Sequence, residues 1–334
     1  MLSKLFDKGR DFLGVEHPII SGGMTWISDF ALVKAVSEAG AFPVFASGNM
    51  PPDLFEKEVD RLVNEIKNPF AVNLITIAPN YRDHFNILLR KNVPFVVFAG
   101  SFPTKNDVVT MKEAGKKTIS FASTESIAEK QIKWGIDALI LEGSEAGGHI
   151  GNVSLIVLLQ QVLFKFREFP IFVSGGLATG EIVAHLLLMG AYGVQMGTRF
   201  VMSDECTAHE NFKKAFKRAR ARTAIATPQY DNKLPVVAVR ALRNKGMENF
   251  GKLQLELLKK LEKDEINRSE AQWEVENYWA GSLRKAVEEG DVETGSLMAG
   301  QSVGLISDIK PLKEIIQDIV NDAMKELERV KTLL

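Results

Sequence analysis

The 334-residue sequence contains a single cysteine, Cys206, and no long apolar run. One cysteine cannot form a disulfide within the chain, so a disulfide-stapled secreted scaffold is excluded, and we expect a reducing, cytoplasmic compartment. No stretch of 18 or more uninterrupted apolar residues occurs, so we expect no membrane span. The first twenty residues lack the apolar centre of a signal peptide, and none is expected.

The charge balance, the histidine spacing and two missing motifs disfavour further classes of protein. Lys and Arg number 41 against 42 Asp and Glu, a formal net charge of −1, so the chain has no overall basic field for nucleic acid. The five histidines show no metal-ligand spacing with the cysteine or with carboxylates, so no catalytic metal is expected. No GxSxG elbow occurs, and no lysine ends an apolar run, which disfavours a serine hydrolase and a Schiff-base enzyme.

What the sequence does contain is a series of short apolar runs, most of which end in glycine or a small polar residue. Each has the length and the weak polar alternation of a buried parallel strand. Their starts are roughly 20 to 30 residues apart, the length of one strand–helix unit. The runs are His17–Gly23, Phe42–Gly48, Phe70–Ile75, Phe95–Gly100, Thr118–Ser123, Ala138–Gly143, Ile171–Gly176 and Gly193–Thr198.

The segments between these runs have helical patterns. Asp29–Ala39 begins with a capping Asp and stops at Gly40. Helices are also predicted at Asp53–Ile66, Ser126–Trp134 and Thr179–Met189. Eight strands that alternate with helices predict an α/β fold, a (β/α)8 TIM barrel. A doubly wound open sheet is the alternative, which the count of eight and the lack of GxGxxG after the first run disfavour.

The pattern changes after Thr198. Residues 205–290 are rich in charge and show no strand–helix repeat, with helical stretches at Asn211–Arg222 and Phe250–Lys263. We therefore expect a barrel formed by residues 1–204 and 296–334, with a mostly helical lid inserted at 205–295. An amphipathic helix at about 312–334 should pack on the barrel.

In a TIM barrel the active site forms at the carboxyl ends of the strands. Glycine is unusually frequent there, and glycine lets a ligand approach the backbone closely. Ser174, Gly175 and Gly176 follow the seventh run, while Gly197 and Thr198 follow the eighth. Because phosphate sites in barrels often lie after these two strands, we predict that a phosphate monoester binds there.

The loop after the sixth run, Gly143–Gly151, consists of small residues around one histidine, His149. An imidazole can donate or accept a proton near neutral pH, so His149 is the predicted catalytic residue. The other four histidines and Cys206 are expected to be structural. A phosphate-bearing cofactor combined with one histidine suits flavin chemistry.

Five motifs together resemble the FMN-dependent family of FabK-type enoyl-acyl-carrier-protein reductases and nitronate monooxygenases, the former 2-nitropropane dioxygenases. They are HPIISGGMTW (17–26), EAGGHIG (145–151), SGGLATG (174–180), QMGTRF (195–200) and GSLMAGQSVGLI (295–306). VRALRNK (239–245) and GSLRKAVEEGDVETGS (281–296) look closer to the FabK-like branch. Residues 223–234 depart from the family pattern, which leaves substrate scope open.

The resemblance implies a tightly bound, non-covalent FMN and a functional role for His149 at the active site. It places Gly22, Gly23 and Met24 beside the flavin ring and Asn73 at its edge, with Gln301 returning to the flavin after the insertion. Gly175, Gly176, Gly197 and Thr198 would hold the phosphate. We also expect Glu142, Gly147, Gly148 and Ser174 in the cofactor site.

Two activities follow from the resemblance. An enoyl-thioester reductase of fatty-acid synthesis would use NAD(P)H to reduce FMN and would accept acyl-carrier-protein or acyl-CoA thioesters. A nitronate monooxygenase would oxidise alkyl nitronates with O2. A non-redox barrel for a phosphorylated metabolite is a third alternative. A carrier protein could dock on a basic run, and a homodimer is compatible with the family. The run comprises Lys213, Lys214, Lys217, Arg218, Arg220 and Arg222.

Overall fold

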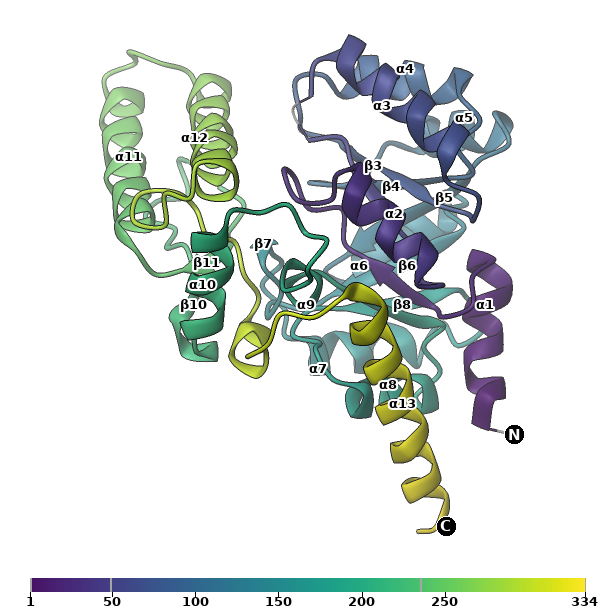
Figure 1. Ribbon diagram of the computed structural model, residues 1–334. Helices are drawn as coiled ribbons and strands as arrows, with labels where there is room; N and C mark the ends of the chain where they lie inside the picture. The colour runs from purple at the N-terminus through teal and green to yellow at the C-terminus, as the bar shows by residue number, and fades with distance from the viewer. Residues whose placement is uncertain (1, 49, 235, 334) are drawn as a thin grey trace.

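A sheet of eight strands, in which every pairing is parallel, forms the centre of the computed structural model, which describes residues 2–48, 50–234 and 236–333 (Figure 1). The strand order is β1-β9-β8-β6-β5-β4-β3-β2. A parallel bridge between Ile20 and Phe42 brings the two edges together, so the sheet is a nearly closed barrel. The strands are β1 (Ile19–Ser21), β2 (Val44–Ala46), β3 (Ala71–Ile75), β4 (Phe95–Ala99), β5 (Lys117–Ala122), β6 (Ala138–Glu142), β8 (Ile171–Ser174) and β9 (Gly193–Met196).

Seven of the eight barrel strands lie inside the predicted apolar runs, and β5 begins one residue before its run, so the TIM-barrel prediction is confirmed. The runs lack polar alternation because barrel strands are covered on both faces, by the barrel interior and by the outer helices. The outer helices are α2 (Phe30–Glu38), α3 (Pro52–Glu65), α4 (Tyr81–Arg90), α5 (Lys105–Glu113), α6 (Glu125–Lys133), α7 (Leu155–Leu158, extended by a π-helical turn at Leu159–Leu163), α8 (Gly180–Leu188) and α13 (Leu312–Lys331).

One end of the barrel is closed by apolar packing. Helix α1 (Asp7–Leu13) carries Leu13, which is fully buried against Phe42, Phe95 and Phe172 of the barrel interior. This layer fills the amino ends of the strands, so a ligand can enter only at the carboxyl ends.

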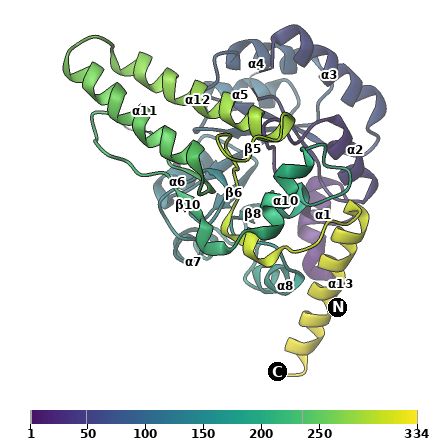
Figure 2. The same ribbon diagram turned by 60° about the vertical axis from the view of Figure 1, so that its left-hand side comes forward.

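The chain between β9 and α13 forms the remaining elements. After the short α9 (Thr198–Val201) come α10 (Glu210–Arg218), β10 (Ala224–Ala226), β11 (Val239–Leu242), α11 (Lys245–Glu262) and α12 (Arg268–Glu288). The last two helices lie side by side (Figures 1 and 2) around buried Phe250, Val275 and Trp279. The predicted helix at 211–222 ends at Arg218, because Ala219 is extended. Treating residues 205–295 as a separate lid stays a proposal.

The structure also contains a small antiparallel sheet that the sequence does not predict. Strand β11 pairs with β10 on one side and with β7 (Gly148–His149) on the other. The inserted segment is therefore hydrogen-bonded to the loop that follows β6, at the barrel mouth.

Candidate functional site

A cavity of about 870 Å³ opens at the carboxyl ends of the barrel strands. It is lined by residues at the ends of every barrel strand except β2, and by residues of α12 between Ser269 and Leu283. The structure brings together all but one of the site residues predicted from the sequence. They are Gly22, Gly23, Met24, Asn73, Glu142, Gly147, Gly148, His149, Ser174, Gly175, Gly176, Gly197 and Thr198.

Gln301 is the exception. It is not among the described residues that line the cavity, although its neighbours Gly300 and Ser302 are. Its backbone N–H donates to the carbonyl of Glu145 at 2.9 Å, which holds the returning chain against the loop after β6. The predicted contact of Gln301 with the cofactor therefore stays a prediction.

Close backbone approach explains two of the rim glycines. Gly175 has φ = +102°, and a Cβ there would lie 2.9 Å from the Gly143 carbonyl oxygen, so a side chain is excluded twice over. At Gly147 a Cβ would lie 2.5 Å from the carbonyl carbon of Ala299. These glycines let the loops after β6 and β8 and the returning chain converge on one mouth.

Two residues that line the cavity carry buried amide groups whose oxygens have no partner within the described chain. Asn73 donates from Nδ2 to the Gly23 carbonyl at 3.0 Å, and Gln195 donates from Nε2 to the Ser174 hydroxyl at 3.3 Å. The oxygens Asn73 Oδ1 and Gln195 Oε1 have no hydrogen-bond partner among the described residues. Buried acceptors without partners are costly, so these atoms suit a ligand with N–H or O–H donors. The polar edge of a flavin ring meets that requirement.

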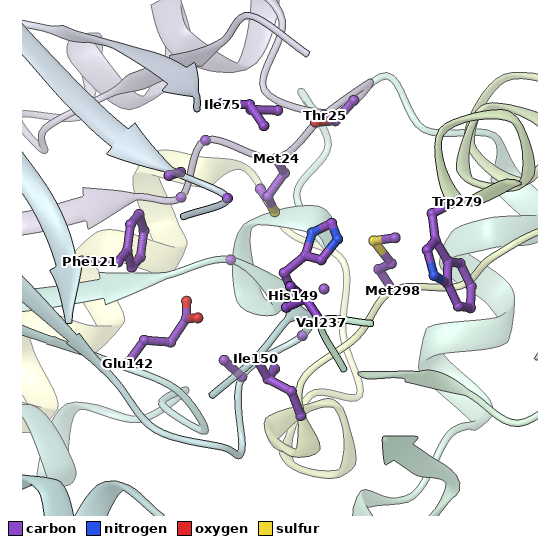
Figure 3. A pocket seen from close by; sticks show the side chains of 18 of the residues that line it. Met24, Thr25, Ile75, Phe121, Glu142, His149, Ile150, Val237, Trp279 and Met298 are labelled. Carbon is purple, nitrogen blue, oxygen red and sulfur yellow. The ribbon is translucent and has the colours of Figure 1, made fainter. Parts of the chain in front are cut away.

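Glu142 ends strand β6, and its carboxyl group points into the cavity near Phe121 (Figure 3). Burial raises the pKa of this carboxyl to about 8. A carboxyl group that is neutral at pH 7 can donate a hydrogen bond to a ligand, as an ionised one cannot.

His149 projects into the cavity between Met24 and Met298, with Trp279 behind Met298 (Figure 3). Its Nε2 lies 3.4 Å from Oε2 of Glu276 on α12. The imidazole is 30% exposed, so it faces both the protein and the cavity.

The other four histidines lie outside the cavity lining, in agreement with their structural interpretation. Burial lowers the pKa of His17 and of His84, whose Nε2 lies 2.8 Å from the Met50 carbonyl oxygen. His185 pairs with Glu326 at 2.7 Å, and His209 Nδ1 accepts from Asn211 N–H at the start of α10.

Cys206 is buried, and that burial raises the pKa of its thiol, which makes it a poor nucleophile. Among the residues that the structure describes, no group of three or more His, Cys, Asp or Glu side chains gathers as a metal site. Nor is any described helix long and apolar enough to cross a membrane.

The structure corrects the predicted docking surface, because one residue of the basic run is buried. Lys213 is 8% exposed and donates from Nζ to the Ser203 carbonyl at 2.7 Å, so it cannot contact a partner. It lies on the buried face of the amphipathic α10, next to Phe212 and Phe216. Four exposed cations of the run have no salt bridge to an acidic side chain among the described residues: Lys217, Arg218, Arg220 and Arg222.

Sequence reasoning missed the part of the cavity wall that α12 supplies. Glu276, Trp279 and Leu283 line the mouth from this helix, while Val237 lines it from the chain just before β11. In the sequence, α12 is a charged helix with no feature that separates Glu276 from its solvated neighbours. Only its position over the mouth gives that residue a special environment.

Comparisons with known proteins agree over nearly the whole chain. A family model described as nitronate monooxygenase matches residues 8–88 and 76–322. The structure of FabK from Thermotoga maritima is 36% identical, covers 97% of this chain and 98% of its own, and superimposes with a TM-score of 0.86.

Two curated relatives have names that describe different activities. The (3aS,4S,5R,7aS)-5-hydroxy-7a-methyl-1-oxo-octahydro-1H-indene-4-carboxyl-CoA dehydrogenase of Mycobacterium tuberculosis is 29% identical over 97% of this chain and 98% of its own length. A probable nitronate monooxygenase of Staphylococcus aureus is 26% identical over 95% and 98%. The shared fold therefore supports more than one chemistry.

Proposed function

The chain belongs to the nitronate monooxygenase family and is a flavin-dependent oxidoreductase, and from this premise we propose that it reduces enoyl thioesters with NAD(P)H. The observation that carries the proposal is the 36% identity to FabK, which extends over the barrel and the inserted segment alike. The sequence motifs at 239–245 and 281–296 favour the same branch.

The residues present fit FMN. Gly22, Gly23 and Met24 would lie beside the ring, and the free oxygens of Asn73 and Gln195 would accept hydrogen bonds from it. The backbone at Ser174–Gly176 and at Gly197–Thr198 would hold the phosphate. When bound, FMN supplies hydride transfer.

His149 would act as the proton donor. Reduction of an enoyl thioester adds a hydride to the β-carbon and a proton to the α-carbon. His149 lines the cavity and its side chain is 30% exposed, so its imidazole can reach a substrate that lies in the mouth. Glu142, neutral at pH 7, would donate a hydrogen bond deeper in the same cavity.

The thioester carrier is part of the proposal. One relative is named as a carboxyl-CoA dehydrogenase, which favours coenzyme A esters, and the exposed Lys217, Arg218, Arg220 and Arg222 would suit an acidic carrier protein. A homodimer stays a prediction.

Nitronate oxidation is the second candidate function, favoured by the matching family model. Anaerobic turnover separates the two. The purified yellow protein, supplied with NADH or NADPH and a short enoyl-CoA, should form one saturated thioester per nicotinamide oxidised. Absence of that product with both nicotinamides, in protein that retains its flavin, would reject the reductase.

A further inference from the structure

The main chain of His149 is held by the inserted segment. His149 pairs with Val239 of β11, and the N–H of Ile150 donates to the Ala238 carbonyl at 2.9 Å. Arg240 of the same strand donates from Nη2 to the Ser144 carbonyl at 2.8 Å. The histidine loop thus takes its position from a strand about 90 residues further along the chain.

The imidazole also meets this segment through its side chain. Glu276 Oε2 of α12 lies 3.4 Å from His149 Nε2, and the two side chains are 33% and 30% exposed. Nε2 itself is buried and has no hydrogen bond to any described residue. The carboxylate is therefore within ion-pair distance of a buried ring nitrogen.

Other carboxylates of the neighbourhood are already occupied or point elsewhere. Glu145 accepts the backbone N–H of Leu155 at 3.0 Å, and Glu274, two residues before Glu276, is exposed. Glu276 owes its place to α12, whose Val275 and Trp279 are buried in the core of the inserted segment. Within the described chain, Glu276 is the acidic residue within salt-bridge distance of His149.

We propose that Glu276 is a positioning residue for His149. A carboxylate beside Nε2 favours the tautomer that carries its proton on that nitrogen and fixes the ring orientation, as the third group of a catalytic triad does. The other nitrogen, Nδ1, is then presented to the substrate, and in the imidazolium form of the ring it carries the proton that is donated. The inserted segment therefore completes the proton-transfer group as well as covering it. The inference rests on the proposed role of His149.

The test uses the flavin-loaded enzyme and a matched pair of positions on α12. Glu276→Ala should lower kcat roughly 10-fold, less than loss of a fully buried triad aspartate. KM should stay within about two-fold, because the interaction serves the chemical step. Glu276→Gln, which keeps an acceptor, should recover part of the loss, and Glu274→Ala should behave as wild type.

A spectroscopic readout separates positioning from general damage. In protein with ¹⁵N-labelled histidine, the His149 ring should show the Nε2–H tautomer, and Glu276→Ala should remove that preference without release of flavin. Unchanged His149 signals, or equal kcat values for Glu276→Ala and Glu274→Ala, would overturn the inference.

The variant His149→Ala distinguishes a failure of the inference from a failure of the proposed function. That variant should retain flavin and slow turnover by roughly 10² to 10⁴-fold. If it turns over normally, His149 is no proton donor and the role assigned to it in the proposed function is wrong. If it is slow while Glu276→Ala is normal, only the positioning role fails. In the double variant, Glu276→Ala should cause no further loss.

Discussion

The hydroxyl of Thr198 accepts a hydrogen bond from the backbone N–H of Gly300 at 3.0 Å. This bond joins the start of α9, just after β9, to the chain that returns after the insertion, 102 residues later. It lies at the predicted phosphate end of the cavity, so under the proposed function one side chain would serve both the closure of the mouth and the cofactor site.

Thr198→Val should therefore loosen the cofactor and lower stability together. The substitution leaves the Gly300 N–H without its acceptor, at a cost of about 1 to 3 kcal/mol in unfolding free energy. Urea unfolding and flavin retention on dialysis measure the two effects. Thr198→Ser should restore both, and Thr207→Val, which removes an exposed hydroxyl bonded to Asp29, should change neither flavin retention nor the cavity. Full flavin retention by Thr198→Val would count against the phosphate assignment.

Gly22→Ala probes the ring end of the cavity. A Cβ there would meet protein atoms only at 3.7 Å or beyond, which is ordinary contact, so the fold should tolerate it. The added methyl group occupies the cavity lining, and the dissociation constant for FMN should rise by roughly 10-fold, about 1.4 kcal/mol. Gly281→Ala, which adds a methyl to open space on α12, is the control. Equal flavin affinities for the two variants would place the ring elsewhere.

Glu142 predicts a pH dependence of stability for the flavin-free protein. Its pKa is raised from 4.5 to about 8 in the folded state, so the folded protein holds a proton that the unfolded chain releases between these values. Stability should fall as pH rises through this window. Glu142→Gln should flatten the slope of melting temperature between pH 5 and pH 8, whereas Glu181→Gln, at an exposed position, should leave it unchanged. An equal slope in Glu142→Gln would show that the carboxyl is not buried as described.

The exposed cations at the C-terminal end of α10 predict how a carrier protein binds. The double variant Lys217→Glu and Arg218→Glu should raise KM for carrier-bound substrate by about 3- to 10-fold, more at low salt. KM for the same acyl group on coenzyme A should not change. The matched double variant Lys57→Glu and Lys67→Glu, on exposed positions of the barrel, is the control. A normal KM for carrier-bound substrate would remove the docking proposal.

The barrel could be predicted because its signals are local. Each strand is a buried apolar run, and most rim glycines stand directly after one, as Gly143, Gly175 and Gly197 do. Helix α5 also has a local sequence signal, since Thr104 and Asp107 form a capping box at its start. The burial of Lys213 could in principle have been read from the apolar face of α10, on which it lies between Phe212 and Phe216.

The small sheet and Glu276 could not be predicted in the same way. Strands β7, β10 and β11 contain two to four residues each, too few for a recognisable period, and β7 exists only because β11 pairs with it. Glu276 is one of several acidic residues on a charged helix. Its distinction is its distance to His149, which depends on how two segments far apart in the sequence fold together.

Anaerobic mixing of the oxidised yellow enzyme with candidate reductants tests the central claim most directly. NADH or NADPH should bleach the flavin absorbance rapidly, and an enoyl thioester added afterwards should restore it. Bleaching by an alkyl nitronate but by neither nicotinamide would contradict the reductase and favour nitronate oxidation.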